Sequence, residues 1–194
     1  MDTTEKTLKP EESLQIIEQM IQKAKTNLHD SSFYFLLWGW IILIAMIGHS
    51  LIIHFTDFNK PYIVWLIVIP GIIATALYGW KTGKKAKVTS HLDRLNFLNW
   101  MIFLASYTII IVFMKQFDYK IGAIIFLLAG NATMLTGFII KFRPLIIGGL
   151  VFWAGIICQF MLPEELIEFI LPIVIIFGYL VPGYLLKFQK NKNA

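Results

Sequence analysis

Six long apolar stretches without a charged side chain dominate this sequence. They cover residues 33–55, 62–80, 97–114, 121–140, 144–162 and 169–186, so each has 18 to 23 residues. A helix needs about 20 apolar residues to cross a hydrocarbon core of about 30 Å. Lipid offers no partner to a bare peptide group, so a spanning segment must be a helix or belong to a closed barrel. Because the stretches are continuously apolar and do not alternate, the sequence predicts six transmembrane helices.

The composition excludes several classes of protein. Apolar residues make up 57% of the chain and charged residues 15%, whereas about a quarter of a soluble domain is charged. A soluble enzyme, a disordered protein and a disulfide scaffold are therefore excluded. Most connections between the stretches are short, which makes consecutive helices antiparallel neighbours. We predict an all-α membrane protein with six transmembrane helices in an up-down bundle.

The positions of Lys and Arg predict the orientation. Fourteen of the seventeen lie before the first stretch, in the connections at 81–96 and 141–143, and after the last stretch. Basic residues are enriched on the cytoplasmic side of membranes, so we expect a multi-pass protein of the inner (plasma) membrane with both termini in the cytoplasm. The predicted parts are a flexible N-terminus at 1–9, a cytoplasmic helix at 10–30, the six-helix domain at 31–187 and a cytoplasmic tail at 188–194.

The segment before the first stretch predicts an amphipathic helix. Pro10 suits a first helical turn, and the polar run at 30–32 predicts the end of the helix. At 3.6 residues per turn, one side of this helix collects the apolar residues Leu14, Ile17, Met20, Ile21, Ala24 and Leu28. The segment 10–30 has four acidic and two basic side chains, so anionic lipid would repel it and protein is the expected cover. Three covers remain open: the basic connection beneath the bundle, a second copy of the chain, or a separate cytoplasmic protein.

The connection at 81–96 concentrates positive charge. Its basic residues are Lys81, Lys84, Lys85, Lys87 and Arg94. A basic residue near anionic headgroups contributes about 1 kcal/mol, so we expect these side chains to contact lipid headgroups or to dock the acidic helix. Membrane topology accounts for the charge, and we expect no nucleic-acid partner.

Few polar side chains lie at membrane depth. The candidates for an intramembrane polar site are Asn131, Thr133 and His49. An unpaired amide in hydrocarbon costs several kcal/mol, so Asn131 must face another helix or water. A hydrogen bond between helices is the simpler interpretation, and a ligand site is the alternative. The stretches contain no carboxylate pair, metal-ligand spacing or nucleophile motif, so we expect no catalytic residue, metal or cofactor.

Small residues and prolines predict how the helices pack. Rows at four-residue spacing are Gly71, Thr75, Gly79 and Gly83 in the second stretch, and Ala129, Thr133 and Gly137 in the fourth. Helices in lipid associate through close packing at small residues, so both rows should face protein. Pro70 and Pro172 lie inside stretches and predict bends.

Three features follow one another in a recognisable order. The leading acidic helix comes first, the run Ser31-Ser32-Phe33-Tyr34-Phe35-Leu36-Leu37-Trp38-Gly39-Trp40 comes second, and the basic turn Gly79-Trp80-Lys81-Thr82-Gly83-Lys84-Lys85 comes third. This order resembles small bacterial polytopic membrane proteins with an N-terminal amphipathic helix, and no activity comes with the resemblance. From the residues we expect a noncatalytic scaffold or regulatory module that acts through its leading helix. The alternative is a small transporter or channel for a neutral or weakly charged solute, which would use Asn131. A membrane enzyme that uses His49 or His54 is a third hypothesis.

Overall fold

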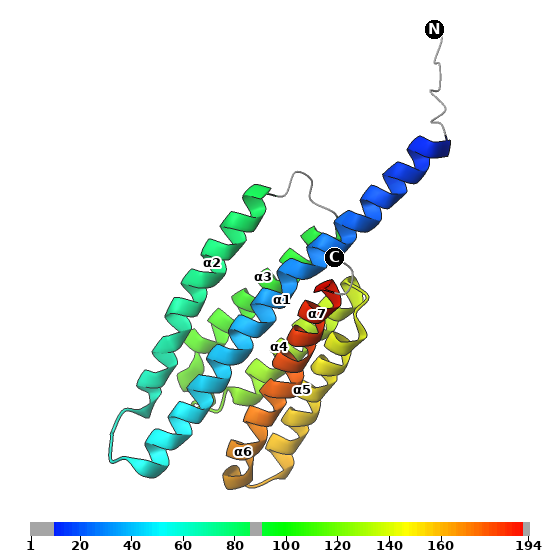
Figure 1. The fold of residues 1–194 in the computed structure, drawn as a ribbon. Helices are drawn as coiled ribbons and strands as arrows, with labels where there is room; N and C mark the ends of the chain where they lie inside the picture. The colour runs from blue at the N-terminus through cyan, green and yellow to red at the C-terminus, as the bar shows by residue number, and fades with distance from the viewer. Residues whose placement is uncertain (1–9, 86–90, 192–194) are drawn as a thin grey trace.

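The computed structural model describes the backbone of residues 10–85 and 91–191, and side chains over 32–84, 91–163 and 165–189. Every regular element in these ranges is a helix (Figure 1). The elements are α1 (Pro10–Phe55), the 3₁₀ helix η1 (Pro61–Ile67), α2 (Val68–Lys85), α3 (His91–Val112), the 3₁₀ helix η2 (Met114–Phe117), α4 (Gly122–Ile139), α5 (Arg143–Met161), α6 (Glu164–Ile175), the π-helix η3 (Ile176–Leu180) and α7 (Val181–Asn191).

Within the described residues, six helical segments are long and apolar enough to cross a membrane. They are Ser32–Phe55, Pro61–Lys84, His91–Val112, Gly122–Ile139, Arg143–Met161 and Glu165–Gln189. Each overlaps one predicted stretch, which confirms the prediction of an all-helical, multi-pass membrane protein. The start of α1 and the end of α7 lie at the same end of the molecule, as an even number of crossings requires (Figure 1).

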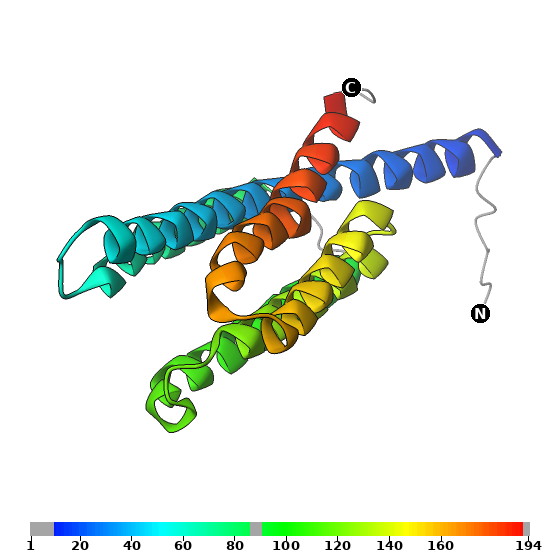
Figure 2. The same ribbon diagram turned by 90° about the horizontal axis from the view of Figure 1, so that it is seen from below.

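Helix α1 is one unbroken helix of 46 residues, so the predicted helix end at 30–32 is wrong. Ser and Asp inside a helix cost at most about 0.7 kcal/mol each, and the turns on both sides propagate the helix through them. At 1.5 Å per residue α1 is about 69 Å long, more than twice the hydrocarbon thickness. A large part of α1 must therefore lie outside the membrane. Figures 1 and 2 show its first part extending beyond the other helices.

The interfaces between the helices differ widely in extent. Helices α4 and α5 form the most extensive interface, α3 packs on α4, and α1 packs on α6, η3 and α7. In the described part of the chain, α2 packs on α1 and η1 and shares no extensive interface with α3. The prediction that consecutive helices are neighbours rests on the short connections, and this connection is the longest between the predicted spans, so it leaves their separation free. Figure 2 shows the last span lying between the α1–α2 pair and the α4–α5 pair.

An aromatic chain joins five elements at the centre of the molecule. The ring centroid of Phe152 lies 5.4 Å from that of Phe126 and 4.8 Å from that of Tyr179. The ring centroid of Phe35 lies 5.8 Å from the ring centroids of both Tyr179 and Trp100. These contacts connect α4, α5, η3, α1 and α3. Because the hydrophobic effect is nearly absent between helices in lipid, such ring contacts and close packing supply much of the attraction.

The small-residue row on α2 faces α1 over most of its length. Gly71 and Gly79 lie against side chains of α1. Between them, Trp38 Nε1 donates a hydrogen bond of 3.1 Å to Thr75 Oγ1. A Cβ at Gly83 would meet nothing within 4 Å, so that member of the predicted row is wrong. Gly83 lies in the last turn of α2.

The small-residue row on α4 is buried, as predicted. Ala129, Thr133 and Gly137 all lie in the core. A Cβ at Gly137 would come within 2.8 Å of the backbone nitrogen of Ile146 in α5. The backbones of α4 and α5 therefore approach closely, which explains why this interface is the most extensive one.

Each predicted proline bend lies beside a change of helix type. Helix α2 begins at Val68, after a 3₁₀ turn and two residues before Pro70. In the last span, Pro172 precedes the π-helix η3, and Pro182, which the sequence analysis passed over, follows it. Pro182 has no N–H, so the Gly178 carbonyl cannot accept the usual helical hydrogen bond from it. A Cβ at Gly148 would lie 2.6 Å from Gly178 O, so glycine is what allows α5 to approach this carbonyl.

Candidate functional site

The predicted partner-binding residues lie in the first part of α1. The side chains of Leu14, Ile17, Met20, Ile21, Ala24 and Leu28 are outside the described set, and their surroundings stay a prediction. The backbone is helical from Pro10 onward, which the amphipathic pattern requires. This part of α1 extends past the ends of α2 and α7 (Figure 1).

The predicted basic set is divided between two helix ends. Lys81 and Lys84 lie in the last turns of α2, Arg94 lies in the first turn of α3, and all three are exposed. Lys84 Nζ lies 3.8 Å from the centroid of the Trp80 ring, a cation–π contact within one helix. Lys87 and the side chain of Lys85 lie outside the described residues. The exposed members can reach headgroups, and the first part of α1 extends past the end of α2 (Figure 1).

The three residues of the predicted intramembrane polar site lie in separate surroundings. Asn131 is exposed on α4, and its Oδ1 accepts a hydrogen bond of 3.0 Å from Trp153 Nε1 of α5. This is a hydrogen bond between helices, as in the simpler interpretation. Thr133 is fully buried and donates a hydrogen bond of 2.7 Å to Ala129 O. His49 lies on α1, which shares no extensive interface with α4 among the described residues.

A polar contact between α3 and α4 was missed by the sequence analysis. Asn99 Nδ2 donates hydrogen bonds to Ala132 O at 2.9 Å and to Thr136 Oγ1 at 3.3 Å. The Thr136 hydroxyl, which is fully buried, donates in turn to Asn96 Oδ1 at 2.9 Å. The sequence signal was the three-residue spacing of Asn96 and Asn99, which places both on one side of α3. These polar groups pair with one another, so the cluster joins helices.

Glu168 connects α6 to the end of α1. Ser50 Oγ donates a hydrogen bond of 3.1 Å to Glu168 Oε2, and His54 Nε2 lies 2.8 Å from the same oxygen. The sequence predicts a last span that begins at residue 169. Helix α6 begins at Glu164, so Glu168 lies inside it. Pro163 at the N-cap and acidic residues in the first turns favour a helix start there.

This group at the end of α1 is not a nucleophilic triad. In a triad the serine hydroxyl donates to a histidine that a carboxylate orients. Here Ser50 and His54 use the same carboxylate oxygen, so Ser50 has no base. His54 and Glu168 have side chains 54% and 38% exposed, which makes the pair a weak surface contact. Over the described ranges, no group of three His, Cys, Asp or Glu side chains is placed to hold a metal ion.

No family model, curated protein or solved structure matches this chain. The fold defines an α-helical, multi-pass membrane protein. Its function must therefore be argued from this chain's own residues and their placement.

Proposed function

We propose that the protein is a noncatalytic membrane scaffold or regulatory module whose first helical part binds a protein. One observation supports this proposal above the others. Helix α1 runs without a break from Pro10 to Phe55, whereas its candidate span begins only at Ser32. The 22 residues before the span amount to about 33 Å of helix. We call residues 10–31 of α1 the leading extension.

The continuity of α1 limits what can cover the apolar side of the leading extension. An amphipathic helix that binds the membrane surface lies in the plane of the interface, so it must turn sharply away from a span. Helix α1 has no interruption at 30–32 where such a turn could occur. The excess of acidic residues between 10 and 30 also opposes binding to anionic lipid. A protein surface is the cover that remains.

The proposal includes two kinds of protein cover. One is a separate cytoplasmic protein, and the other is a second copy of the chain. Two copies that cross the membrane in the same direction would pair their extensions in parallel. Heptad a and d positions are then filled by Leu14, Ile17, Ile21, Ala24 and Leu28.

The orientation and arrangement of the spans belong to the same proposal. We place both termini in the cytoplasm, the chain in an inner membrane, and the spans in up-down order. The asymmetric distribution of Lys and Arg supports this orientation. It puts the leading extension on the side where cytoplasmic partners are found.

The transport alternative has less support among the described residues. Asn131 lies on the exposed side of α4, whereas Thr133 is buried on another side of the same helix and donates to Ala129 O. A solute path needs several polar groups that share one interior surface. The predicted residues for such a path do not share one, so we do not propose transport.

Single cysteines in the leading extension test the proposal. In a Cys158→Ser background, Leu14→Cys and Ile21→Cys should form a cross-linked product of one defined mass in intact membranes. Gln15→Cys and Gln19→Cys lie on the polar side of the same turns, and should react with a water-soluble maleimide without cross-linking. A product with twice the mass of the chain identifies a second copy, and another mass identifies a partner. Equal maleimide labelling at all four positions, with no cross-linked product, contradicts the proposal.

A further inference from the structure

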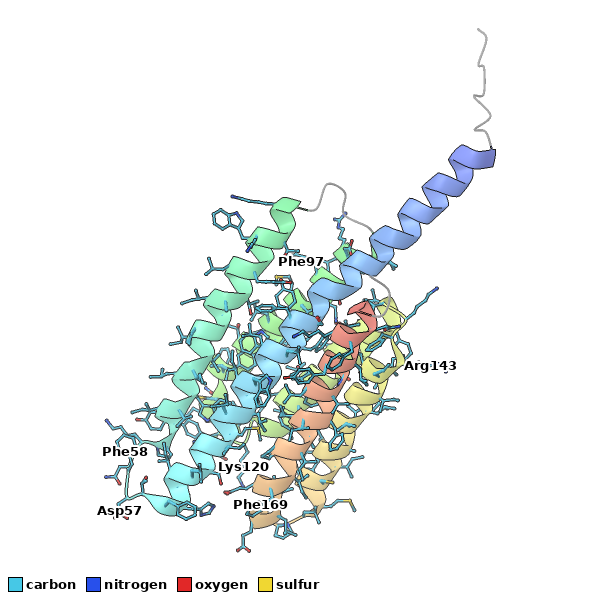
Figure 3. All side chains as sticks on the ribbon, viewed as in Figure 1. Asp57, Phe58, Phe97, Lys120, Arg143 and Phe169 are labelled. Carbon is cyan, nitrogen blue, oxygen red and sulfur yellow. The ribbon has the colours of Figure 1, made fainter. Side chains whose placement is uncertain are left out.

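Asn131 lies near the middle of a candidate span. It follows the first residue of α4 by nine positions and precedes the last by eight, so at least about 12 Å of helix separates it from either end. Figure 3 labels Lys120 just before α4 and Arg143 just after it, toward opposite ends of the bundle. Charged side chains at helix ends extend to the headgroup layer, so Asn131 lies at the depth of the hydrocarbon.

The hydrogen bond with Trp153 fixes how the Asn131 side chain is turned. The indole N–H can only donate, so the amide oxygen must face Trp153, and Nδ2 lies on the other side of the amide group. Asn131 is exposed, and among the residues that the structure describes no acceptor takes a hydrogen bond from its Nδ2. Hydrocarbon contains no acceptor either, and an unpaired polar group there is costly. The two donors of Nδ2 therefore need an acceptor from another protein chain at the same depth.

The exposed side of α4 around Asn131 lies opposite its buried side. At 3.6 residues per turn, Asn131 lies about 160° around the helix axis from Thr133, the middle member of the buried row. The neighbours of Asn131 on the exposed side are apolar and large. We call this set the α4 stripe: Leu127, Asn131, Leu135 and Phe138. Because the buried row faces the core, the α4 stripe faces outward from the molecule.

The polar group of the α4 stripe is complementary to itself. Two copies related by a two-fold axis along the membrane normal cross the membrane in the same direction, so residues near the axis meet their own counterparts at equal depth. The Oδ1 atom of Asn131 has a second lone pair beside the one that Trp153 uses. Each Asn131 can therefore donate from Nδ2 to Oδ1 of the partner's Asn131 and accept the same bond in return. A second copy supplies the missing acceptor at the required depth.

We infer that two copies of the chain pair through the α4 stripe, with Asn131 of each copy hydrogen-bonded to the partner's Asn131. The apolar members of the stripe pack on both sides of this bond, and a single Asn in an apolar seam sets the register of a helix pair. Trp153 flanks the contact. It is the eleventh of the 19 residues of α5 and is exposed at mid-membrane, whereas lipid-facing tryptophans gather at the two membrane interfaces. Tryptophan is enriched where proteins meet, which agrees with its position beside the stripe.

This inference goes beyond the proposed function, because it concerns the outer side of α4 and does not depend on the leading extension. Figure 2 shows the last span between the α1–α2 pair and the α4–α5 pair. Pairing through the α4 stripe therefore keeps the two α1 helices on the outer sides of the dimer. It leaves the leading extension to a separate protein.

Disulfide formation between single cysteines in the full chain tests the pairing. In a Cys158→Ser background, Leu127→Cys and Leu135→Cys lie one turn before and after Asn131. Oxidation with copper phenanthroline in vesicles of low protein content should give a product with twice the mass of the chain at both positions. Ile72→Cys, which is exposed in the middle of the α2 span, measures random collisions and should stay monomeric. No dimer at either α4 position, a dimer of equal yield at Ile72→Cys, or a product of another mass would overturn the inference.

Substitutions of Asn131 separate the hydrogen bond from the apolar packing around it. Asn131→Leu has a similar size without the donors, and should weaken dimerisation about 3- to 30-fold, the range expected for one hydrogen bond between membrane helices. Asn131→Gln keeps the amide and should lose less. Thr108→Val removes an exposed hydroxyl that bonds within α3 and should leave dimerisation unchanged.

Energy transfer between donor- and acceptor-labelled chains, measured over a series of protein-to-lipid ratios, gives the dimerisation constant of each variant. If Asn131→Leu dimerises as strongly as the parent chain, or if Thr108→Val loses as much as Asn131→Leu, the assigned role of Asn131 is refuted.

Discussion

Gly148 is the position at which a single added methyl group tests the packing of the last span. In Gly148→Ala, the new Cβ would lie 2.6 Å from Gly178 O, and neither this Cβ, whose position the backbone fixes, nor the carbonyl oxygen can rotate away. Helix α5 and η3 must separate by several tenths of an ångström, and overpacking of this kind costs about 1–3 kcal/mol. Alanine regains at most about 1 kcal/mol of helix propensity over glycine. Taking the middle of each range, we expect a net loss of about 1 kcal/mol in the free energy of unfolding.

Gly83→Ala is the matched control for this experiment. It makes the same substitution in a helix, at a glycine whose Cβ would meet nothing within 4 Å. At this position the added methyl group meets no neighbour, so only the higher helix propensity of alanine acts. The free energy of unfolding should therefore rise by about 0.5 kcal/mol. Unfolding by SDS titration in mixed micelles, followed by circular dichroism, measures both variants. If Gly148→Ala is as stable as the parent chain, or more stable than Gly83→Ala, the close approach of α5 to the Gly178 carbonyl is refuted.

Two further predictions use the same unfolding assay. Thr136→Val removes the hydroxyl that joins Asn96 and Asn99 and should cost about 0.6–2 kcal/mol, whereas Thr108→Val removes a bond within one helix and should cost less. Equal losses in the two threonine variants would mean that the α3–α4 contact does not stabilise the fold. Glu168→Gln weakens the contact with His54 and should cost less than about 1 kcal/mol, because both side chains are partly exposed. Glu165→Gln, which changes an exposed carboxylate of the same helix, is its control, and a larger effect there would contradict the assigned role of Glu168.

The fold class was predictable because each span has its own signal. A stretch of about 20 apolar residues must form a helix in lipid whatever its neighbours are, so the six spans follow from local composition. The burial of the small-residue row on α4 was also predictable, since a four-residue spacing places its members on one side of the helix. Gly83 continues the pattern on α2, but a Cβ there would meet no described atom within 4 Å. Periodicity identifies a side of a helix without showing how far along that side a partner stays in contact.

The candidate sites were less predictable, because they depend on which helices meet. Asn131 was the most conspicuous polar residue at membrane depth, yet it lies on the exposed side of α4 beside Trp153. The close approach of α5 to η3 requires Gly148 and Gly178 to lie opposite each other, although they are distant in sequence. Neither residue has a chemical signature that marks it in advance.

By itself, the amino-acid sequence determined the membrane class, the number of spans and the charge asymmetry on which the orientation depends. These follow from transfer free energies that each segment experiences independently of the others. Only the tertiary structure decided that α2 and α3 separate, and that the last span changes to a π-helix beside α5. Those features depend on the balance of packing between segments far apart in sequence, where a single methyl group at Gly148 is enough to change which backbone arrangement fits.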